Sequence, residues 1–118
     1  MEKTLLYTKG AHHRFDPKNI LYITGDQNYC HLHLLNGKVI LMSHTLKRYE
    51  QRWPHFLRVH KHALVNPAYA TQLDLAPCLR LPSYLVMQNQ ARLNISRRRL
   101  AIVCQQLTTI HQPTQMRC

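Results

Sequence analysis

Apolar and polar residues alternate over short stretches through most of the chain, a pattern that favours β-strands over long helices. Ile20–Ile23 is a compact apolar segment, and Tyr29–Leu35 alternates clearly. Further short strands are predicted at Leu5–Thr8, Thr71–Leu75, Cys78–Leu81, Tyr84–Met87 and Ala91–Ile95. The last two form a hairpin that turns at residues 88–90. The pattern therefore predicts a mostly β chain, with a loop over residues 9–18 and a turn over residues 24–28.

Asn36-Gly37 is the strongest hairpin signal, because both residues tolerate the positive φ of a two-residue type I′ turn. With this pair as the turn, the apolar residues of the two strands share a core face, namely Leu32, Leu34, Val39 and Leu41. The other face carries two histidines, His31 opposite Met42 and His33 opposite Ile40. We expect that second face to be partly covered.

Two stretches have the spacing of an amphipathic helix. Thr45 is a good N-cap for the first, which Pro54 ends and which carries Leu46, Tyr49 and Trp53 along one side. Ser96 is a good N-cap for the second, whose apolar stripe should dock on a sheet and consists of Leu100, Val103, Cys104, Leu107 and Ile110. The tail, residues 111–118, is expected to be frayed.

The segment Phe56–Asn66 combines apolar strand character with dense positive charge. Its alternation fails at His60-Lys61-His62 and gives way to an apolar run at Ala63. In a regular strand Lys61 would lie opposite the two histidines, but the broken pattern indicates a bend that turns Lys61 outward. A histidine between apolar neighbours is more often a buried hydrogen-bonding residue than a ligand or base, so we interpret His60 as structural. The role of His62 stays open.

Positive charge is in large excess, with 16 Lys and Arg against 5 Asp and Glu and a net charge of +11. No acidic residue occurs from Leu75 to Cys118, so the surface should attract polyanions. Arg97, Arg98 and Arg99 begin the second helix, where the macrodipole disfavours each cation by about 0.3–1 kcal/mol. A phosphate backbone at this helix end would make the arrangement favourable. The alternative is an ordinary solvated charge run.

The length of 118 residues fits a single domain over residues 1–118. Cys30, Cys78 and Cys104 have apolar neighbours and are interpreted as reduced core residues, which suits a cytoplasmic setting. The first ten residues have neither a signal peptide nor a membrane anchor, and no apolar run approaches the ~20 residues that span a bilayer. We therefore expect no membrane insertion.

Four pieces of the sequence, in the right order and spacing, resemble the LytTR DNA-binding domain over about Pro17 to Ile110. They are Ile20-Leu21-Tyr22-Ile23 followed by Asn28-Tyr29, Thr45-Leu46-Lys47, Phe56-x-Arg58-Val59-His60-Lys61-His62-x-Leu64-Val65-Asn66, and Ile95-Ser96-Arg97-Arg98. The third piece is the most specific. The resemblance implies an elongated arrangement of small antiparallel β-sheets with a short middle helix and a C-terminal helix. Residues 17–110 would be its core.

The resemblance also implies how such a domain contacts DNA, through loops that enter successive major grooves from one side. The matching positions here are Asn28, Lys61 and Arg97. Asn28 suits an adenine edge, whereas Lys61 and Arg97 suit guanine or phosphate. A small polar residue is usual in the family where this chain has His62. The other DNA-binding candidates are basic residues of the same two segments, namely Arg58, His62, Arg98 and Arg99.

Members of this family usually carry the domain after a receiver domain in a bacterial response regulator, and they tend to bind direct repeats as two copies. The 118 residues hold no receiver domain. We therefore expect a stand-alone transcriptional regulator, which an initial Met1 favours, or a piece of a longer one. The sequence identifies no sensor kinase or other regulatory partner.

RNA or an acidic protein is the main alternative partner. The six tyrosines fall mostly in apolar or turn contexts, which favours duplex DNA over stacking on RNA bases. An enzyme or a metal site would have to use His31-x-His33 and His60-x-His62, with few carboxylates to complete it. We therefore expect no catalysis, no metal ion and no cofactor.

Overall fold

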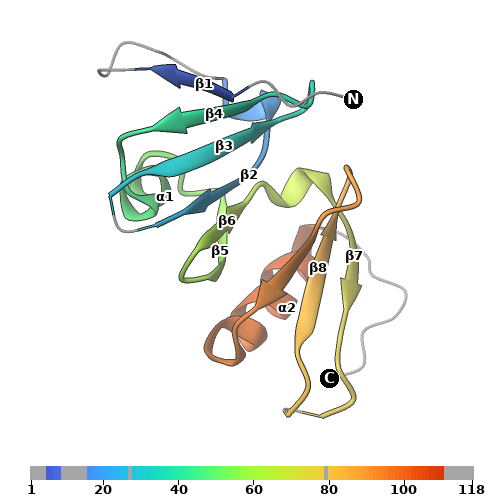
Figure 1. The fold of residues 1–118 in the computed structure, drawn as a ribbon. Coiled ribbons are helices and arrows are strands. Elements are labelled where there is room, and N and C mark those ends of the chain that lie inside the picture. The colour runs from blue at the N-terminus through green and yellow to red at the C-terminus, as the bar shows by residue number, and fades with distance from the viewer. Residues whose placement is uncertain (1–4, 9–15, 27, 79, 111–118) are drawn as a thin grey trace.

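The computed structural model describes residues 5–8, 16–26, 28–78 and 80–110. Short strands form two sheets, in the orders β1-β4-β3-β2-β6-β5 and β7-β8-β9, and two α-helices pack against them (Figure 1). The strands of the first sheet are β1 Leu5–Thr8, β2 Ile20–Gly25, β3 Cys30–Leu34, β4 Val39–Met42, β5 Leu57–His60 and β6 Ala63–Val65. Those of the second are β7 Ala70–Asp74, β8 Ser83–Met87 and β9 Arg92–Ile95, and the helices are α1 Leu46–Arg52 and α2 Arg97–Ile110.

The expected mostly β, elongated fold is confirmed. The longest dimension is 43 Å, against 28 and 24 Å for the other two. Strand pairing is antiparallel throughout both sheets except between β1 and β4, which run parallel. Single 3₁₀ turns at Pro17–Asn19 and Pro67–Tyr69 lead into β2 and β7.

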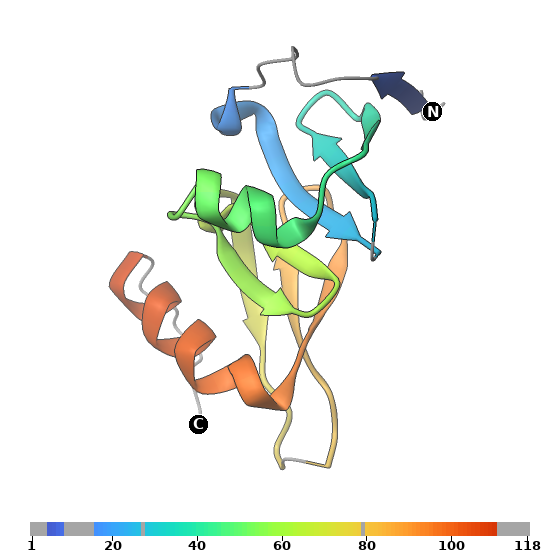
Figure 2. The same cartoon turned by 90° about the vertical axis from the view of Figure 1, so that its left-hand side faces the viewer.

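Two apolar clusters form on opposite faces of the first sheet (Figure 2). On one face α1 buries Leu46 and Tyr49 against fully buried residues of the sheet, namely Ile20, Ile23, Leu32 and Leu64. On the other face Val59 and Val65 meet residues of the second sheet and of α2, namely Leu85, Met87, Val103 and Leu107. The β5–β6 hairpin therefore lies between two cores, which holds its strands in place from both sides.

Both predicted helices are confirmed. The Thr45 hydroxyl oxygen accepts a hydrogen bond from the Arg48 N–H at 3.3 Å, so Thr45 caps α1 as predicted. Pro54 follows the last turn of α1, and Trp53 is buried just beyond it. The stripe of α2 is buried at Val103, Cys104 and Leu107 and half-buried at Leu100.

The β3–β4 hairpin turns at Asn36-Gly37, but the predicted two-residue turn is wrong. The Leu34 carbonyl accepts from the Gly37 N–H at 3.1 Å, and the Leu34 N–H donates to the Lys38 carbonyl at 2.9 Å. Three residues therefore lie in the loop, and Gly37 ends it with a φ of 89°.

The extra loop residue shifts the register of this hairpin by one position. His31 faces Leu41 instead of Met42, and His33 faces Val39 instead of Ile40. Ile40 and Met42 consequently join the core against α1, where Val39 and Leu41 were expected. The histidine face is partly covered, as predicted, because His31 and His33 are both half-buried.

The second sheet contains the predicted hairpin of β8 and β9, in which Gln90 takes a φ of 74°. The strand predicted at Cys78–Leu81 is wrong, because the described residues between β7 and β8, 75–78 and 80–82, form an irregular connection. Two prolines, Pro77 and Pro82, bracket that segment and lack the N–H groups a ladder needs. Cys78 lies in this connection and is exposed, so its expected place in the core is also wrong.

The other two described cysteines are buried, as predicted. Burial raises the pKa of the Cys30 thiol to about 12, which keeps it protonated. Cys118 and the tail over residues 111–118 lie outside the described residues, as do residues 9–15 of the predicted first loop.

Candidate nucleic-acid interface

The β5–β6 hairpin presents Lys61 and His62 at its turn. His60 pairs with Ala63, so these two residues alone connect the strands. Val59 and Ala63 are buried on either side of the turn, whereas Lys61 and His62 are exposed. The predicted bend is confirmed, because the apolar strands hold both ends of the turn and leave Lys61 in solvent.

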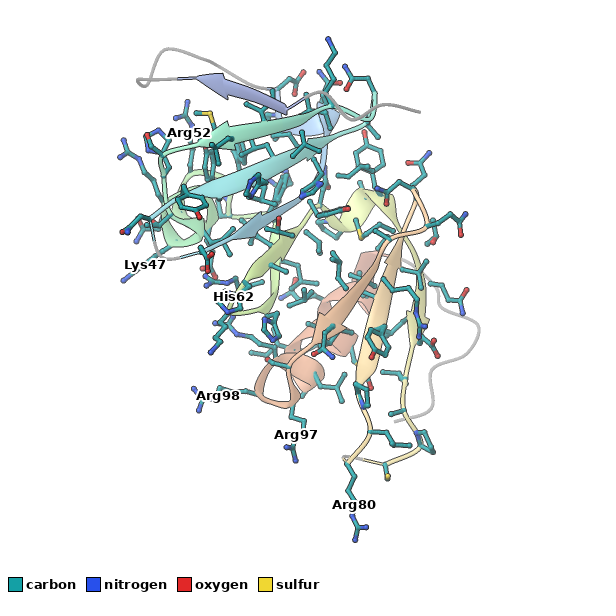
Figure 3. All side chains as sticks on the ribbon, in the orientation of Figure 1. Lys47, Arg52, His62, Arg80, Arg97 and Arg98 are labelled. Atoms are coloured by element: carbon teal, nitrogen blue, oxygen red, sulfur yellow. The ribbon has the colours of Figure 1, made fainter. Side chains whose placement is uncertain are left out.

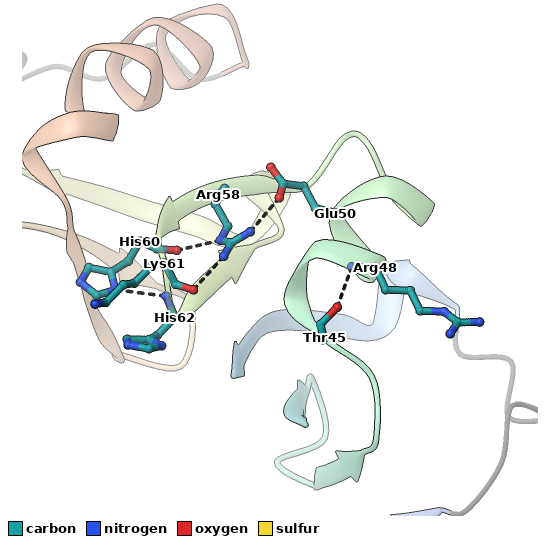
Figure 4. Close-up of polar contacts among 7 residues, drawn as sticks. All are labelled: Thr45, Arg48, Glu50, Arg58, His60, Lys61 and His62. Atoms are coloured by element: carbon teal, nitrogen blue, oxygen red, sulfur yellow. Dashed lines mark hydrogen bonds and ion pairs between the residues drawn. The ribbon is translucent and has the colours of Figure 1, made fainter. Parts of the chain in front are cut away.

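Arg58 supports this turn from beneath (Figure 4). Its guanidinium donates from Nε to the His60 carbonyl at 2.9 Å and from Nη2 to the Lys61 carbonyl at 2.7 Å. Nη1 donates to Oε1 of Glu50, on α1, at 2.8 Å. Only 16% of the Arg58 side chain is exposed, so its charge is directed mainly into the protein.

His62 links the turn to the β2–β3 connection. The Gly25 N–H donates to the His62 carbonyl at 3.0 Å, and the His62 Nδ1 lies 3.0 Å from the Gly25 carbonyl oxygen. A carbonyl oxygen can only accept, so Nδ1 of His62 carries a hydrogen. Asn28 is exposed three residues beyond Gly25 in the same connection. The two segments that contain Asn28 and Lys61, far apart in sequence, are thereby joined.

His60 holds the turn through its side chain. Its Nδ1 accepts a hydrogen bond from the His62 N–H at 3.2 Å, which requires an unprotonated Nδ1. Burial lowers the pKa of the His60 imidazole below its usual value, and the positive charges of His62, Lys61 and Arg58 lower it further. The neutral form is therefore favoured, which agrees with the structural role predicted for His60.

The start of α2 is fixed to the same hairpin. The Ser96 N–H donates to the Val59 carbonyl at 2.9 Å, and the Arg99 N–H donates to the Ser96 carbonyl at 3.0 Å. The first turn of α2 consequently begins beside β5. Arg97 and Arg98 are exposed, whereas Arg99 is half-buried.

Exposed basic side chains follow one side of the molecule from α1 to the β7–β8 connection (Figure 3). We call this surface the basic strip, and it consists of Lys47, Arg52, Lys61, His62, Arg80, Arg97 and Arg98. Within the described residues the ion pairs are Arg58–Glu50 and Arg92–Asp74, so none of the strip side chains is neutralised by a carboxylate. The strip is therefore able to bind a polyanion without breaking an internal ion pair.

A hollow of about 340 Å³ opens between the two joined loops and β9. It is lined by Thr24, Gly25, Asp26, Tyr29, His31, His60, His62, Ala63 and Asn94. Tyr29 is 45% exposed there and packs edge-on against His31. The loops thus surround a concave, mixed polar and aromatic surface.

Comparison with known proteins agrees with this fold. The family model of the LytTr DNA-binding domain matches residues 10–108, most of the chain. The chain belongs to the LytTR family. Among solved structures it is similar to a LytTr DNA-binding domain from Bacillus cereus, with a TM-score of 0.66 and 17% identity over 76% of this chain and 82% of that one. At that identity the likeness shows the fold alone. The search of curated proteins gave no match.

The LytTR family is one of DNA-binding domains, which supports a DNA partner for this chain. Of the seven candidates from the sequence, the structure places His62, Arg97 and Arg98 on the strip, with Lys61 next to His62 in the same turn (Figure 4) and Asn28 on the loop joined to it. Arg58 lies beneath the turn instead, and Arg99 is half-buried at the start of α2.

Lys47, Arg52 and Arg80 belong to the strip but are not among the site residues predicted from the sequence. Lys47 belongs to the LytTR-like piece Thr45-Leu46-Lys47, but no local pattern distinguishes residues of the strip from other exposed basic residues. Arg80 lies in the stretch Cys78–Leu81, which the sequence predicts as a strand and whose described residues form none. Its exposure depends on the irregular connection between β7 and β8.

The described part of the chain contains no group of three or more His, Cys, Asp or Glu side chains arranged to hold a metal ion. His60 and His62 have ring centroids 5.5 Å apart, but each already uses Nδ1 within the protein. Among the described helices, none has the length and apolar character needed to cross a bilayer.

Proposed function

We propose that this LytTR domain binds double-stranded DNA sequence-specifically, as a bacterial transcriptional regulator whose loops enter major grooves. The observation that carries the proposal is the junction of three distant segments on the basic strip. Hydrogen bonds join Gly25 to His62 and Val59 to Ser96, so the Asn28 loop, the Lys61 turn and the start of α2 form one surface. No internal carboxylate competes with DNA for the strip cations within the described residues.

The side chains divide into reading and positioning roles. Asn28 and Lys61 are exposed at loop tips, where Asn can pair with an adenine edge and Lys with guanine or phosphate. Arg97 and Arg98 stand at a helix N-terminus, where guanidinium groups and free N–H groups both suit phosphate. Arg58 and His62 act mainly by holding the turn, since both are hydrogen-bonded within the protein.

The mechanism is binding without a chemical reaction. The strip supplies sequence-independent affinity that falls as salt rises, because each neutralised phosphate releases a condensed counterion. The loop tips then discriminate between bases, with about 1–3 kcal/mol for each good contact. Because internal hydrogen bonds already fix the loops, less conformational entropy is lost when the protein binds DNA.

In vitro selection from a random duplex library tests this proposal most directly. Sequence-specific binding predicts enrichment of a defined motif. Mobility shifts at matched salt should then show tighter binding to that duplex than to single-stranded DNA or structured RNA. Preference for RNA, or no enrichment, would contradict duplex recognition.

Variants of the strip test the assigned surface. Lys61→Ala and Arg98→Ala should weaken binding to the selected duplex, while Lys38→Ala should leave it unchanged. Lys38 is an exposed cation at the β3–β4 turn, away from the basic strip, and is therefore a charge-matched control. Equal losses in all three variants would indicate nonspecific charge attraction instead of a defined interface.

We also propose that two protomers bind a direct repeat. A single domain is 43 Å long and covers little more than one DNA turn of about 34 Å, so each protomer would contact one copy of the repeat. Selected motifs should then contain two copies spaced by about one turn or a multiple of it. Binding stoichiometry on one-copy and two-copy duplexes measures this directly. A single-copy motif bound by one protomer with full affinity would contradict it.

A further inference from the structure

Arg80 extends the basic strip beyond the loops that carry the sequence-reading candidates. It lies in the irregular connection between β7 and β8, while Lys61 and Arg97 belong to other segments. Figure 3 shows Arg80 at the end of the strip, beyond Arg97. Arg80 is exposed, and within the described residues it takes part in no ion pair.

The connection that carries Arg80 is held against the second sheet. At its base, the Ala76 N–H donates to the buried Ser83 hydroxyl at 2.9 Å. Near its tip, the Leu81 N–H donates to the Cys78 carbonyl at 3.3 Å, which closes a turn around Arg80. These bonds hold Arg80 on the same side as α2 without using its guanidinium.

Arg80 and Arg97 line one groove of about 980 Å³ between this connection and the first turn of α2. Among the described residues, no Asp or Glu lines the groove. Its other lining residues are mainly apolar, including Leu75, Leu81, Pro82 and Leu100. Two guanidinium groups from separate elements therefore border one hollow, with no internal anion to neutralise them.

We infer that Arg80 binds a phosphate of the DNA flank next to the sequence motif, on the side where α2 docks. The inference rests on the proposed duplex binding. A body 43 Å long exceeds one DNA turn of about 34 Å, so its end lies over backbone outside the motif that the loops read. Guanidinium is suited to phosphate oxygens, and such a contact adds affinity without sequence preference.

The test uses duplexes that carry one copy of the selected motif, so that a single protomer binds. It compares a minimal duplex, which ends at that copy, with duplexes extended by about 5 base pairs, or about 17 Å, at one end or the other. The wild type should bind one of the two extended duplexes more tightly than the minimal duplex. Arg80→Ala should lose that gain and bind the minimal duplex like the wild type. Arg80→Lys, which keeps the charge, should retain part of the gain. Lys38→Ala should behave like the wild type on all three duplexes.

Salt dependence gives an independent measure. Loss of one phosphate contact lowers the slope of log K against log salt by about 0.9, so the affinity advantage of the wild type should shrink about 3.5-fold between 50 and 200 mM salt. Equal affinities and slopes for the wild type and Arg80→Ala on the extended duplex would overturn the inference. An equal loss by Arg80→Ala on minimal and extended duplexes would also overturn it, since Arg80 would then act within the motif.

Failure of the flank contact is distinguishable from failure of duplex recognition. Lys61→Ala on the minimal duplex reports recognition alone. If it weakens binding while Arg80→Ala has no effect on any duplex, the proposed function stands and the flank contact is wrong. If the wild type selects no motif, both fail. Circular dichroism and a thermal melt of Arg80→Ala check that this exposed-loop variant is folded.

Discussion

The Arg58 guanidinium lies 2.8 Å from the Glu50 carboxylate through Nη1, while its two other nitrogens donate to the carbonyls of His60 and Lys61. Glu50 belongs to α1 and Arg58 to β5, so one side chain connects a helix to the turn that carries Lys61. The carboxylate orients the guanidinium, and the guanidinium fixes the carbonyls of the turn. Positive charge near the interface is thus partly used for internal support.

Arg58→Ala should destabilise the fold by about 1–3 kcal/mol, because two carbonyls of the turn lose charged donors. Glu50→Ala should cost only about 0–1 kcal/mol, since 35% of the Glu50 side chain is exposed and the pair is partly solvated. Urea denaturation of both variants measures the difference, with Arg48→Ala as an exposed arginine control on α1. An equal cost for Arg58→Ala and Glu50→Ala would mean that the ion pair, not the carbonyl bonds, carries the stability.

Gly25→Ala should destabilise the protein and weaken DNA binding together. A Cβ at Gly25 would lie 2.9 Å from Leu46 Cγ and 3.1 Å from Cys30 Cβ, and both atoms belong to the packed core against α1. Crowding of this kind costs about 1–3 kcal/mol. Relief of the crowding would displace Gly25, whose N–H and carbonyl both bond His62.

Gly37→Ala provides the contrast for this effect. Its positive φ of 89° makes alanine strained, at a cost of about 1–2 kcal/mol, but Gly37 lies in the β3–β4 turn. Both variants should have lower stability by thermal melting, whereas only Gly25→Ala should bind the selected duplex more weakly at a temperature where both are folded. Equal binding by the two variants would show that the Gly25–His62 contact does not shape the interface.

His60 should make stability fall in mild acid. Its folded pKa is lowered, so the unfolded chain, with a histidine pKa near 6.5, takes up the proton more readily. The His60 contribution is therefore complete above about pH 6.5 and is lost as the pH falls from there toward the folded pKa. Protonation of Nδ1 would also remove the bond to the His62 N–H.

His60→Asn isolates this contribution from the other histidines, because an amide oxygen can accept the His62 N–H and does not titrate. Urea unfolding at pH 7.5 and pH 5.5 should show a smaller loss of stability in the variant than in the wild type. Parallel pH profiles for the two proteins would exclude His60 as the source. The charged groups that face the ring are His62, Lys61 and Arg58, and they are unchanged in the variant.

Local sequence patterns predicted the elements whose determinants lie within a few residues. A compact apolar segment identified β2, alternation identified β3, and Thr45 with Pro54 bounded α1. The same reasoning missed the β3–β4 register, because a glycine with positive φ suits both a two-residue and a three-residue loop. It also placed Cys78 in a strand, although the neighbouring prolines made a ladder unfavourable.

The candidate site was only partly accessible from sequence, for a different reason. A run of basic residues does not indicate which side chains point outward. Lys61 and Arg58 both belong to the specific LytTR-like piece, yet Lys61 is exposed and Arg58 bonds three internal oxygens. Likewise, the contact between Gly25 and His62 joins residues 37 positions apart, and no local pattern reports it.

Arg98→Glu should raise stability and abolish specific binding in one substitution. The first turn of α2 carries no acidic residue and has arginine at three successive positions, an arrangement opposed to the helix dipole. A carboxylate at position 98 should therefore stabilise the fold by about 0.3–1 kcal/mol, measured by thermal or urea denaturation at low salt. On DNA the same carboxylate would face phosphate and repel it, so the affinity of Arg98→Glu for the selected duplex should fall well below that of Arg98→Ala.

Arg99→Glu is the comparison variant, because Arg99 is half-buried and not on the basic strip. If Arg98→Glu lowered stability, or bound the selected duplex as tightly as Arg99→Glu does, the arginines at this helix start would not have been retained for DNA.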